Sequence, residues 1–300
     1  MKKEERGKTM EHKKEMLQAQ EPKKDYRQED ESRAMSPEPK IEYSEYKAAD
    51  KLKGKTAIVT GADSGIGAAV AIAFAKEGAN VALVDYDDKE DAEKVKNRIK
   101  EISGQVLWFT GDVGDEDFVK NVVSQTVAEY GSIDILVNNA AEQHTRKSIS
   151  EVTSEQLTRT FQTNIFSMFY FVKAVLPHFN PYAKIINTTS VTAYKGSANL
   201  LDYASTKGAI VAFTRSLSQN QEMIDKKIRV NAVAPGPIWT PLIPATTPND
   251  DKETFGESVP MKRAGEAYEL APAYVYLASD DSSYVTGQVI HVNGGSIVNG

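Results

Sequence analysis

The feature of this 300-residue chain that most restricts its fold is an alternation of short apolar runs with longer amphipathic stretches. The runs are continuous and rich in β-branched residues, which is typical of strands that helices cover on both faces. Between them, Asp88–Ile102 and Glu116–Tyr130 have helical spacing, and Thr153 with Gln156 forms a capping-box pattern before a long helix through the 160s and 170s. The predicted strands are Thr56–Thr60, Val81–Val84, Val106–Phe109, Ile133–Val137, Lys184–Asn187, Ile228–Val233 and Val289–Val292.

Strand, helix and strand repeated in this way indicate right-handed βαβ units and one parallel sheet. The sequence therefore predicts an α/β fold: a single doubly wound, Rossmann-type, seven-stranded parallel sheet with helices on both faces. Ligands of such sheets bind beyond the carboxyl ends of the strands. The residues that follow each strand are therefore the candidates for function.

Residues 1–50 differ in composition from the rest of the chain. They hold 12 Lys or Arg and 13 Asp or Glu, and Leu17 and Ile41 are their only residues from the set Val, Ile, Leu and Phe. Such a segment cannot bury enough apolar surface to offset its ordering entropy. We predict a charged N-terminal extension, 1–50, that is largely disordered or draped on the surface, with a short helix near Glu11–Gln20. It either solubilises the protein or has a role in assembly or in covering the active site.

Composition excludes several classes of protein. The net charge of −6 argues against nucleic acid or an anionic membrane as the main partner. The chain has no cysteine and its four histidines are widely scattered, so we predict no metal site. No run approaches the roughly 18 apolar residues of a membrane span, and no apolar segment follows the basic N-terminus. We expect a soluble, cytoplasmic protein.

A glycine-rich turn, Thr60-Gly-Ala-Asp-Ser-Gly-Ile-Gly67, follows the first predicted strand. Glycines there allow the backbone to approach a pyrophosphate, and the N–H groups of the next helix point at the phosphates. Such a turn alone is a weak signal, but its place between a strand and a helix strengthens it. The predicted cofactor-binding residues of this turn are Gly61, Asp63, Ser64, Gly65, Ile66 and Gly67.

Polar residues also follow the next three strands. Asp85 lies 18 residues past Gly67, near the spacing at which an acid binds the adenosine ribose hydroxyls. A carboxylate there repels a 2′-phosphate, and neither Ser64 nor Tyr86 supplies a cation, so the sequence favours NAD and leaves NADP open. The residues expected to line the adenine and ribose side of the same crevice are Asp112, Val113, Asn139 and Ala140.

Tyr203 and Lys207 are four residues apart, on one face of a predicted helix. This spacing is common by chance, and Tyr43 with Lys47 repeats it inside the charged extension. Position relative to the sheet separates the two pairs, because Tyr203 begins a helix after the fifth strand, 13 residues beyond Ser190.

These motifs together resemble the classical short-chain dehydrogenase/reductase family, over about residues 40–300. Within it, the chain is most similar to the bacterial general stress protein 39 and aldehyde-reductase-like group, which also has a polar N-terminal extension. Ala141 departs from the glycine of many members, and this is a small change. The matching pieces are TGADSGIG at 60–67, Asp112-Val113, NNAA at 138–141, Asn164, Ser190, Tyr203 with Lys207, and PGPIWT at 235–240.

The resemblance implies that residues 51–300 are an NAD(P)-binding catalytic domain that transfers a hydride between nicotinamide and a carbonyl/alcohol substrate. Tyr203 would be the general acid/base, because a carbonyl that accepts hydride develops alkoxide charge and needs a proton. Lys207 would favour tyrosinate and bind the nicotinamide ribose, and Ser190 would polarise the substrate oxygen. Asn164 would hold a water that links Lys207 to solvent.

Further expectations concern the nicotinamide, the substrate and the assembly. The residues that would close over the nicotinamide are Pro235, Gly236, Ile238 and Thr240. Substrate walls are expected from 141–147, 191–200 and 241–261. Glu142, Gln143 and His144 are candidates for contact with substrate, and His144 is expected to be a solvated loop residue and not a catalytic one. Trp239 either stacks on substrate or packs the loop. The family resemblance implies a homotetramer through helices around 164–179 and 203–224.

Two other functions are weighed against this oxidoreductase. A non-catalytic dinucleotide-binding regulator on the same fold is opposed by the presence of Ser190, Tyr203 and Lys207. An epimerase or dehydratase is opposed by the 93 residues that follow Lys207, since those relatives usually carry a larger C-terminal substrate domain. The sequence does not distinguish aldehyde, sugar, steroid or keto-ester substrates.

Overall fold

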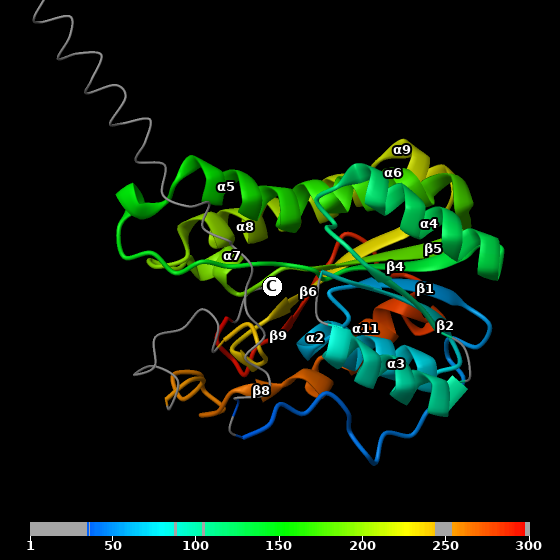
Figure 1. Cartoon of the computed structure of the whole chain (residues 1–300), viewed down its shortest axis with the longest axis horizontal. Coiled ribbons are helices and arrows are strands. Elements are labelled where there is room, and N and C mark those ends of the chain that lie inside the picture. Colours follow the sequence, from blue (N-terminus) through cyan, green and yellow to red (C-terminus); the bar gives the residue numbers. More distant parts are fainter. Residues whose placement is uncertain (1–34, 36, 87–88, 104–105, 244–253, 298–300) are drawn as a thin grey trace, which may run out of the picture.

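A computed structural model describes residues 35, 37–86, 89–103, 106–243 and 254–297 of the chain. Its centre is a parallel sheet of seven strands, as the sequence predicts (Figure 1), and their order is β3-β2-β1-β4-β5-β6-β9. The reversal of strand order between β1 and β4 marks the crevice where such sheets bind ligands. The strands are β1 (Thr56–Thr60), β2 (Asn80–Asp85), β3 (Val106–Thr110), β4 (Ile133–Asn138), β5 (Phe179–Thr188), β6 (Arg229–Pro235) and β9 (Val289–Val292).

Helices cover both faces of this sheet (Figure 1). On β1, Ala57 and Val59 belong to one apolar core, and Ile58, between them, belongs to the other. Burial on both faces explains why the strands read as continuous apolar runs. One face carries α2 (Gly65–Lys76), α3 (Lys89–Ser103) and α11 (Ala271–Ala278), and the other α4 (Glu116–Tyr130), α5 (Ser154–Phe161), α6 (Ser167–Val175), α8 (Leu201–Ser218) and α9 (Gln221–Asp225).

Short elements complete the fold around the sheet. The long helix predicted through the 160s and 170s is divided by a π-helical turn, Gln162–Phe166, between α5 and α6. A second, two-stranded parallel sheet joins β7 (Ile238–Trp239) to β8 (Gly265–Glu266). The remaining single turns of helix are Ile149–Glu151, Leu176–His178, α7 (Thr192–Lys195), Ala267–Glu269 and Asp280–Ser282.

The described part of the N-terminal extension runs along the surface beside α2, α3 and β8, in blue at the lower edge of Figure 1. Glu77, which follows α2 and is 1% exposed, accepts hydrogen bonds from the Tyr46 hydroxyl (2.5 Å) and from the backbone N–H groups of Ala49 (3.0 Å) and Lys51 (2.9 Å). The predicted helix at 11–20 lies outside the described residues. The division of the chain at residue 50 stays a prediction.

Candidate active site

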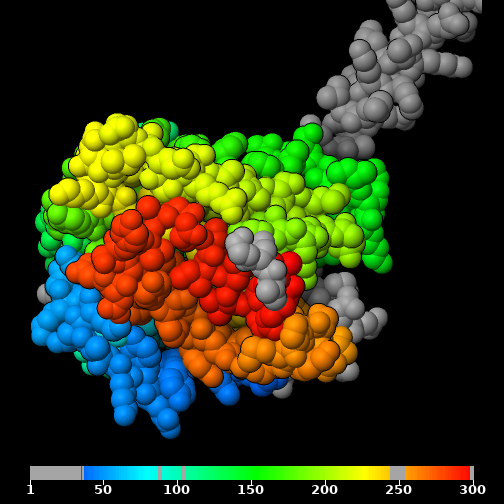
Figure 2. Space-filling model, turned by 180° about the vertical axis from the view of Figure 1, so that it is seen from behind, coloured from blue at the N-terminus to red at the C-terminus, as the bar shows by residue number. Residues whose placement is uncertain are grey.

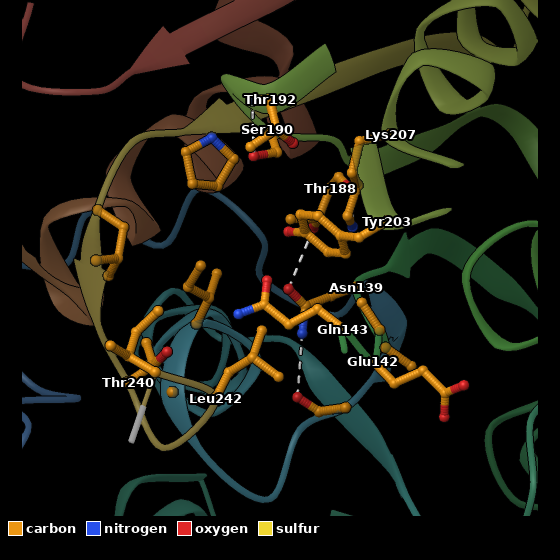
Figure 3. Close-up of a pocket in the computed structure, with 18 of the residues that line it drawn as sticks. Asn139, Glu142, Gln143, Thr188, Ser190, Thr192, Tyr203, Lys207, Thr240 and Leu242 are labelled. Carbon is orange, nitrogen blue, oxygen red and sulfur yellow. Dashed lines mark hydrogen bonds between the residues drawn. The ribbon is translucent and has the colours of Figure 1, made fainter. Parts of the chain in front are cut away.

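The carboxyl ends of the central strands surround one cavity of about 1240 Å³. All the predicted site residues line it except Gly67, which lies beneath the glycine-rich turn, and Asn164, which is fully buried beside it. In Figure 3, Ser190, Tyr203 and Lys207 lie on one side of the cavity and Thr240 on the other, with Gln143 between them. The fold therefore brings together residues from the carboxyl ends of β1 to β6 and from α8.

The glycine-rich turn leaves no space for side chains where the backbone bends. A Cβ added to Gly67 would lie 1.8 Å from the Gly61 carbonyl oxygen, and Gly65 has a φ of +49° that favours glycine. Ser64 precedes α2 and donates its hydroxyl hydrogen to Asp63 (3.0 Å). Because Ser64, Gly65 and Ile66 all line the cavity, the N-terminal end of α2 faces it, which is the arrangement that binds phosphate.

Asn139 braces this turn against the side of the cavity that holds Ser190, Tyr203 and Lys207. Its amide nitrogen donates to the carbonyl oxygens of Thr60 and Gly61, each at 3.1 Å. Its amide oxygen accepts from the Thr188 hydroxyl at 3.2 Å. Asn139 therefore links the turn after β1 to the end of β5, where Lys207 is bound.

Asp85 and Asp112 lie where the ribose and adenine are expected, and each has a partner that the sequence did not reveal. The indole N–H of Trp108 donates to Asp85, which is 2% exposed. Arg159, on α5, forms ion pairs with Asp112 and with Glu142 (3.2 Å), and stacks its guanidinium 5.4 Å from the Tyr86 ring centroid. Both carboxylates are thus held by side chains distant in sequence.

Ser190, Tyr203 and Lys207 meet at the end of β5 and the start of α8. The Ser190 hydroxyl lies near Tyr203, whose pKa it lowers, and accepts from the Thr192 N–H at 3.2 Å. The Lys207 ammonium lies 5.3 Å from the Tyr203 ring centroid and donates to the Thr188 carbonyl oxygen at 2.9 Å. Tyr203 is 9% exposed and Lys207 1% exposed, so both groups are nearly removed from water.

Burial shifts both of these groups toward their neutral forms. It raises the pKa of Tyr203 to about 12, although the hydrogen bond with Ser190 opposes the shift. It lowers the pKa of Lys207 to about 7. In the ligand-free protein at neutral pH, Tyr203 therefore carries the proton that a general acid needs.

Asn164 lies in the π-helical turn and has no exposed surface. Its amide oxygen accepts from the Glu142 N–H (2.9 Å), and its amide nitrogen donates to the Glu142 carbonyl (2.9 Å) and to Thr206 (3.1 Å). These bonds join the loop after β4 to α8, one residue before Lys207. The predicted role of Asn164 in holding a water stays a prediction.

The structure bears on the expectations for two further residues, His144 and Trp239. The side chain of His144 is 11% exposed and lies 3.5 Å from Glu142, so the expectation of a solvated loop residue is wrong. Trp239 donates to the Pro37 carbonyl at 2.8 Å and lies against Phe255, so it packs the loop. The cavity-lining residues that sequence reasoning missed include Arg159, Thr163, Thr188 and Thr189.

The residues present fit a dinucleotide. The glycine-rich turn, packed so closely that Gly67 has no space for a Cβ, the start of α2 and the buried carboxylate of Asp85 border the same cavity as Tyr203 and Lys207. Within the described residues, no group of three or more His, Cys, Asp or Glu side chains is arranged to bind a metal. No helix in the described part of the chain is long and apolar enough to cross a membrane.

A dinucleotide cradle beside a buried tyrosine, lysine and serine defines a nicotinamide-dependent oxidoreductase acting on a small molecule. The family model described as "Enoyl-(Acyl carrier protein) reductase" matches residues 61–296. The chain belongs to the short-chain dehydrogenase/reductase family, which confirms the resemblance predicted from its motifs.

Individual relatives support the same assignment. The chain is 60% identical over 263 residues to "Uncharacterized oxidoreductase YhxC" of Bacillus subtilis (88% of this chain, 92% of the relative). It is 54% identical over 264 residues to "General stress protein 39" of B. subtilis (88% and 92%), and 48% identical over 288 residues to "NADPH-dependent aldehyde reductase 1, chloroplastic" of Arabidopsis thaliana (94% and 99%). Among solved structures, 3-ketoacyl-(acyl-carrier-protein) reductase from Brucella melitensis complexed with NADH is similar at 34% identity and a TM-score of 0.75, covering 82% of this chain and 100% of that one.

Proposed function

We propose that this oxidoreductase reduces a carbonyl group, or oxidises the corresponding alcohol, with Tyr203 as its general acid/base. The observation that carries the proposal is the meeting of Ser190, Tyr203 and Lys207 on the wall opposite Thr240, inside the cavity that contains the dinucleotide cradle (Figure 3). When bound, the dinucleotide supplies or accepts the hydride. The side chains of the protein handle the substrate oxygen and its proton.

In the reducing direction, the substrate oxygen lies between the Ser190 and Tyr203 hydroxyls. As hydride reaches the carbonyl carbon, negative charge develops on this oxygen, and Tyr203 donates its proton there to give the alcohol. Tyr203 is left as tyrosinate and regains a proton from solvent. The nearby Lys207 ammonium stabilises the tyrosinate, since opposite charges at short range favour the ionised form.

In the oxidising direction, Tyr203 accepts the proton of the alcohol and therefore must ionise first. Burial opposes this by raising the pKa of Tyr203 to about 12. The positive charge of an oxidised nicotinamide ring acts in the other direction and lowers it, as does Lys207 while it keeps its own proton, whose pKa burial lowers to about 7. We therefore expect alcohol oxidation to accelerate as the pH rises, and carbonyl reduction to be favoured at neutral pH.

For the cofactor, we propose a preference for NADH over NADPH. Asp85, buried at the end of β2 and held by Trp108, is in a position to accept hydrogen bonds from the ribose hydroxyls and to repel a 2′-phosphate. The Arabidopsis relative is named as NADPH-dependent, and the Brucella enzyme is complexed with NADH. Any assay must therefore include both cofactors.

For the assembly, we propose a homotetramer in the cytoplasm. Leu157, Phe166 and Phe169 leave 43%, 40% and 48% of their surface exposed along α5, the π-helical turn and α6. Apolar residues gathered on neighbouring turns are typical of an interface between copies of one chain. Size-exclusion chromatography with light scattering tests this, and a 33.0 kDa particle would contradict it.

The proposed activity is tested by screening aldehydes, ketones, aldoses and polyols with NADH and NADPH, followed through the nicotinamide absorbance. With the best substrate, Ser190→Ala is expected to lower kcat at least roughly tenfold, because it removes the hydroxyl beside the developing charge. Ser205→Ala is the matched control, since Ser205 lies on α8 and its hydroxyl donates to the Leu201 carbonyl. Dinucleotide binding without turnover of any substrate in the screen would favour the non-catalytic regulator.

A further inference from the structure

The indole of Trp239 connects the N-terminal extension to the wall of the active-site cavity. Trp239 lies between Ile238 and Thr240, which both line the cavity, and its ring centroid is 6.1 Å from that of Phe255, which lines it as well. On its other side, the indole N–H donates to the Pro37 carbonyl at 2.8 Å. One side chain thus contacts the extension and the cavity wall together.

The segment that contains Pro37, residues 37–43, is fastened to the same small sheet that carries Trp239. We name this segment the strap. The Lys40 N–H donates to the Glu266 carboxylate at 3.0 Å, and the Lys40 carbonyl accepts from the Tyr268 N–H at 3.3 Å. Tyr43 stacks on Tyr268 with ring centroids 5.5 Å apart. Glu266 is the register partner of Trp239 in the β7–β8 pair.

A second attachment fixes the strap to the helices beneath the sheet. The Glu42 carboxylate accepts from Lys76 on α2 (2.6 Å) and from Arg98 on α3 (two bonds of 2.8 Å). Hydrogen bonding to Arg98 is the main cause that lowers the pKa of Glu42 to about 2, despite its partial burial. Seen from behind, the C-terminal residues in orange and red adjoin the blue N-terminal part of the chain (Figure 2). The strap therefore joins α2 and α3 to the β7–β8 sheet beside the cavity wall.

We propose that the strap, through Trp239, positions the part of the cavity wall formed by Ile238, Thr240 and Phe255, and that Trp239 is a positioning residue for the carbonyl substrate. Ile41 packs against the apolar core that contains α2, and hydrogen bonds, ion pairs and one ring stack make the remaining contacts of the strap. The contacts that orient its first residues end directly behind the cavity wall, at Trp239, which lies between the lining residues Ile238 and Thr240, and at its register partner Glu266. This inference rests on the proposed carbonyl reduction for its kinetic readout.

The test compares two shortened chains with the full chain. A variant without residues 2–45 lacks the strap but keeps Tyr46, Ala49 and Lys51 on Glu77. The matched control lacks only residues 2–34 and keeps the strap. We expect loss of the strap to raise the substrate KM by roughly fivefold, the factor that one hydrogen bond of ordinary net strength supplies, with kcat and the dinucleotide Kd within about twofold. The control should match the full chain.

Trp239→Phe separates positioning from general stabilisation, because it removes the N–H donor and keeps an aromatic ring against Phe255. In the full chain it should raise KM by about the same factor as loss of the strap. In the chain without residues 2–45 it should add nothing, because both changes remove one interaction. If the two changes multiplied in their effect on KM, or if either variant alone left KM unchanged, the proposal would be overturned. If the shortened chain does not fold, Tyr43→Ala, which detaches the exposed Tyr43 ring from Tyr268, takes its place.

Fluorescence tests the strap without any turnover. Trp108 and Trp239 are the two tryptophans of the chain, so Trp108→Phe leaves Trp239 as the single emitter. Loss of the strap should shift its emission to the red and increase quenching by acrylamide, whereas the control without residues 2–34 should emit like the full chain. Unchanged emission would contradict the strap itself. A shift without carbonyl reduction would contradict only the proposed function.

Discussion

Replacing Lys207 with methionine should change how the stability of this protein depends on pH. Lys207 is 1% exposed, and burial lowers its pKa from 10.5 to about 7. In the unfolded chain its ammonium titrates near its ordinary value of about 10.4. Between these two values the unfolded state binds more protons than the folded state, so the free energy of unfolding rises with pH.

The size of the effect follows from the shift. At about 1.4 kcal/mol per pKa unit, lowering the pKa from 10.5 to about 7 corresponds to about 5 kcal/mol in total. This contribution is fully present above the unfolded pKa and is lost as the pH falls through the folded value. Integrating the linkage relation assigns about 2 kcal/mol of it to the interval from pH 7 to pH 9. The Lys207→Met variant lacks this gain.

The assay is urea unfolding at pH 7, 8 and 9 with the protein concentration fixed, because subunit association also affects apparent stability. The difference in free energy of unfolding between the original chain and Lys207→Met should grow by about 2 kcal/mol over this range. Lys53→Met is the matched control, since the exposed Lys53 pairs with Asp50, which raises its pKa away from this range. Parallel pH curves for the original chain and Lys207→Met would refute the buried, weakly basic lysine.

Two further variants test the dinucleotide cradle, both by calorimetric titration. Asp85→Ala should weaken NADH binding by roughly tenfold or more, the cost of hydrogen bonds to a charged acceptor, and should narrow or reverse the preference over NADPH. NADH affinity within about twofold of the original would contradict the role of Asp85. Gly67→Ala should abolish dinucleotide binding, because its Cβ would lie 1.8 Å from the Gly61 oxygen, whereas Gly208→Ala meets nothing within 4 Å and should bind normally. Equal binding by these two variants would refute the close packing of the turn.

The central strands were predictable because the local sequence pattern of each strand indicates its burial. β1, α4 and β9 have the bounds predicted for them, since a strand covered on both faces and a helix with one apolar stripe each have a clear period. The first half of β5 was missed. Its residues Asn180, Pro181 and Tyr182 are polar, ring-constrained or exposed, and Tyr182 has a φ of +65°. The extent of this strand depends on pairing with β4, which no local pattern encodes.

The site was predictable in its motifs and not in its supporting contacts. The positions of Ser190, Tyr203 and Lys207 follow from the strands and helix that carry them. By contrast, Arg159 meets Asp112 across 47 positions of sequence, and Trp108 meets Asp85 across 23. The π-helical turn similarly depends on bonds between Asn164 and residues of other elements. Single-sequence patterns record local periodicity, and these contacts are set by the tertiary arrangement.

The most direct test of the proposed mechanism is Tyr203→Phe, which removes one hydroxyl and keeps the buried ring. Single-turnover reduction of the best carbonyl substrate should slow by at least roughly 100-fold, the lower limit for loss of a general acid. The Kd for NADH, measured on the same preparation, should stay within about twofold, because the cradle at Gly61–Gly67 is untouched. Turnover at the original rate by Tyr203→Phe would contradict the assignment of Tyr203 as the acid/base of this enzyme.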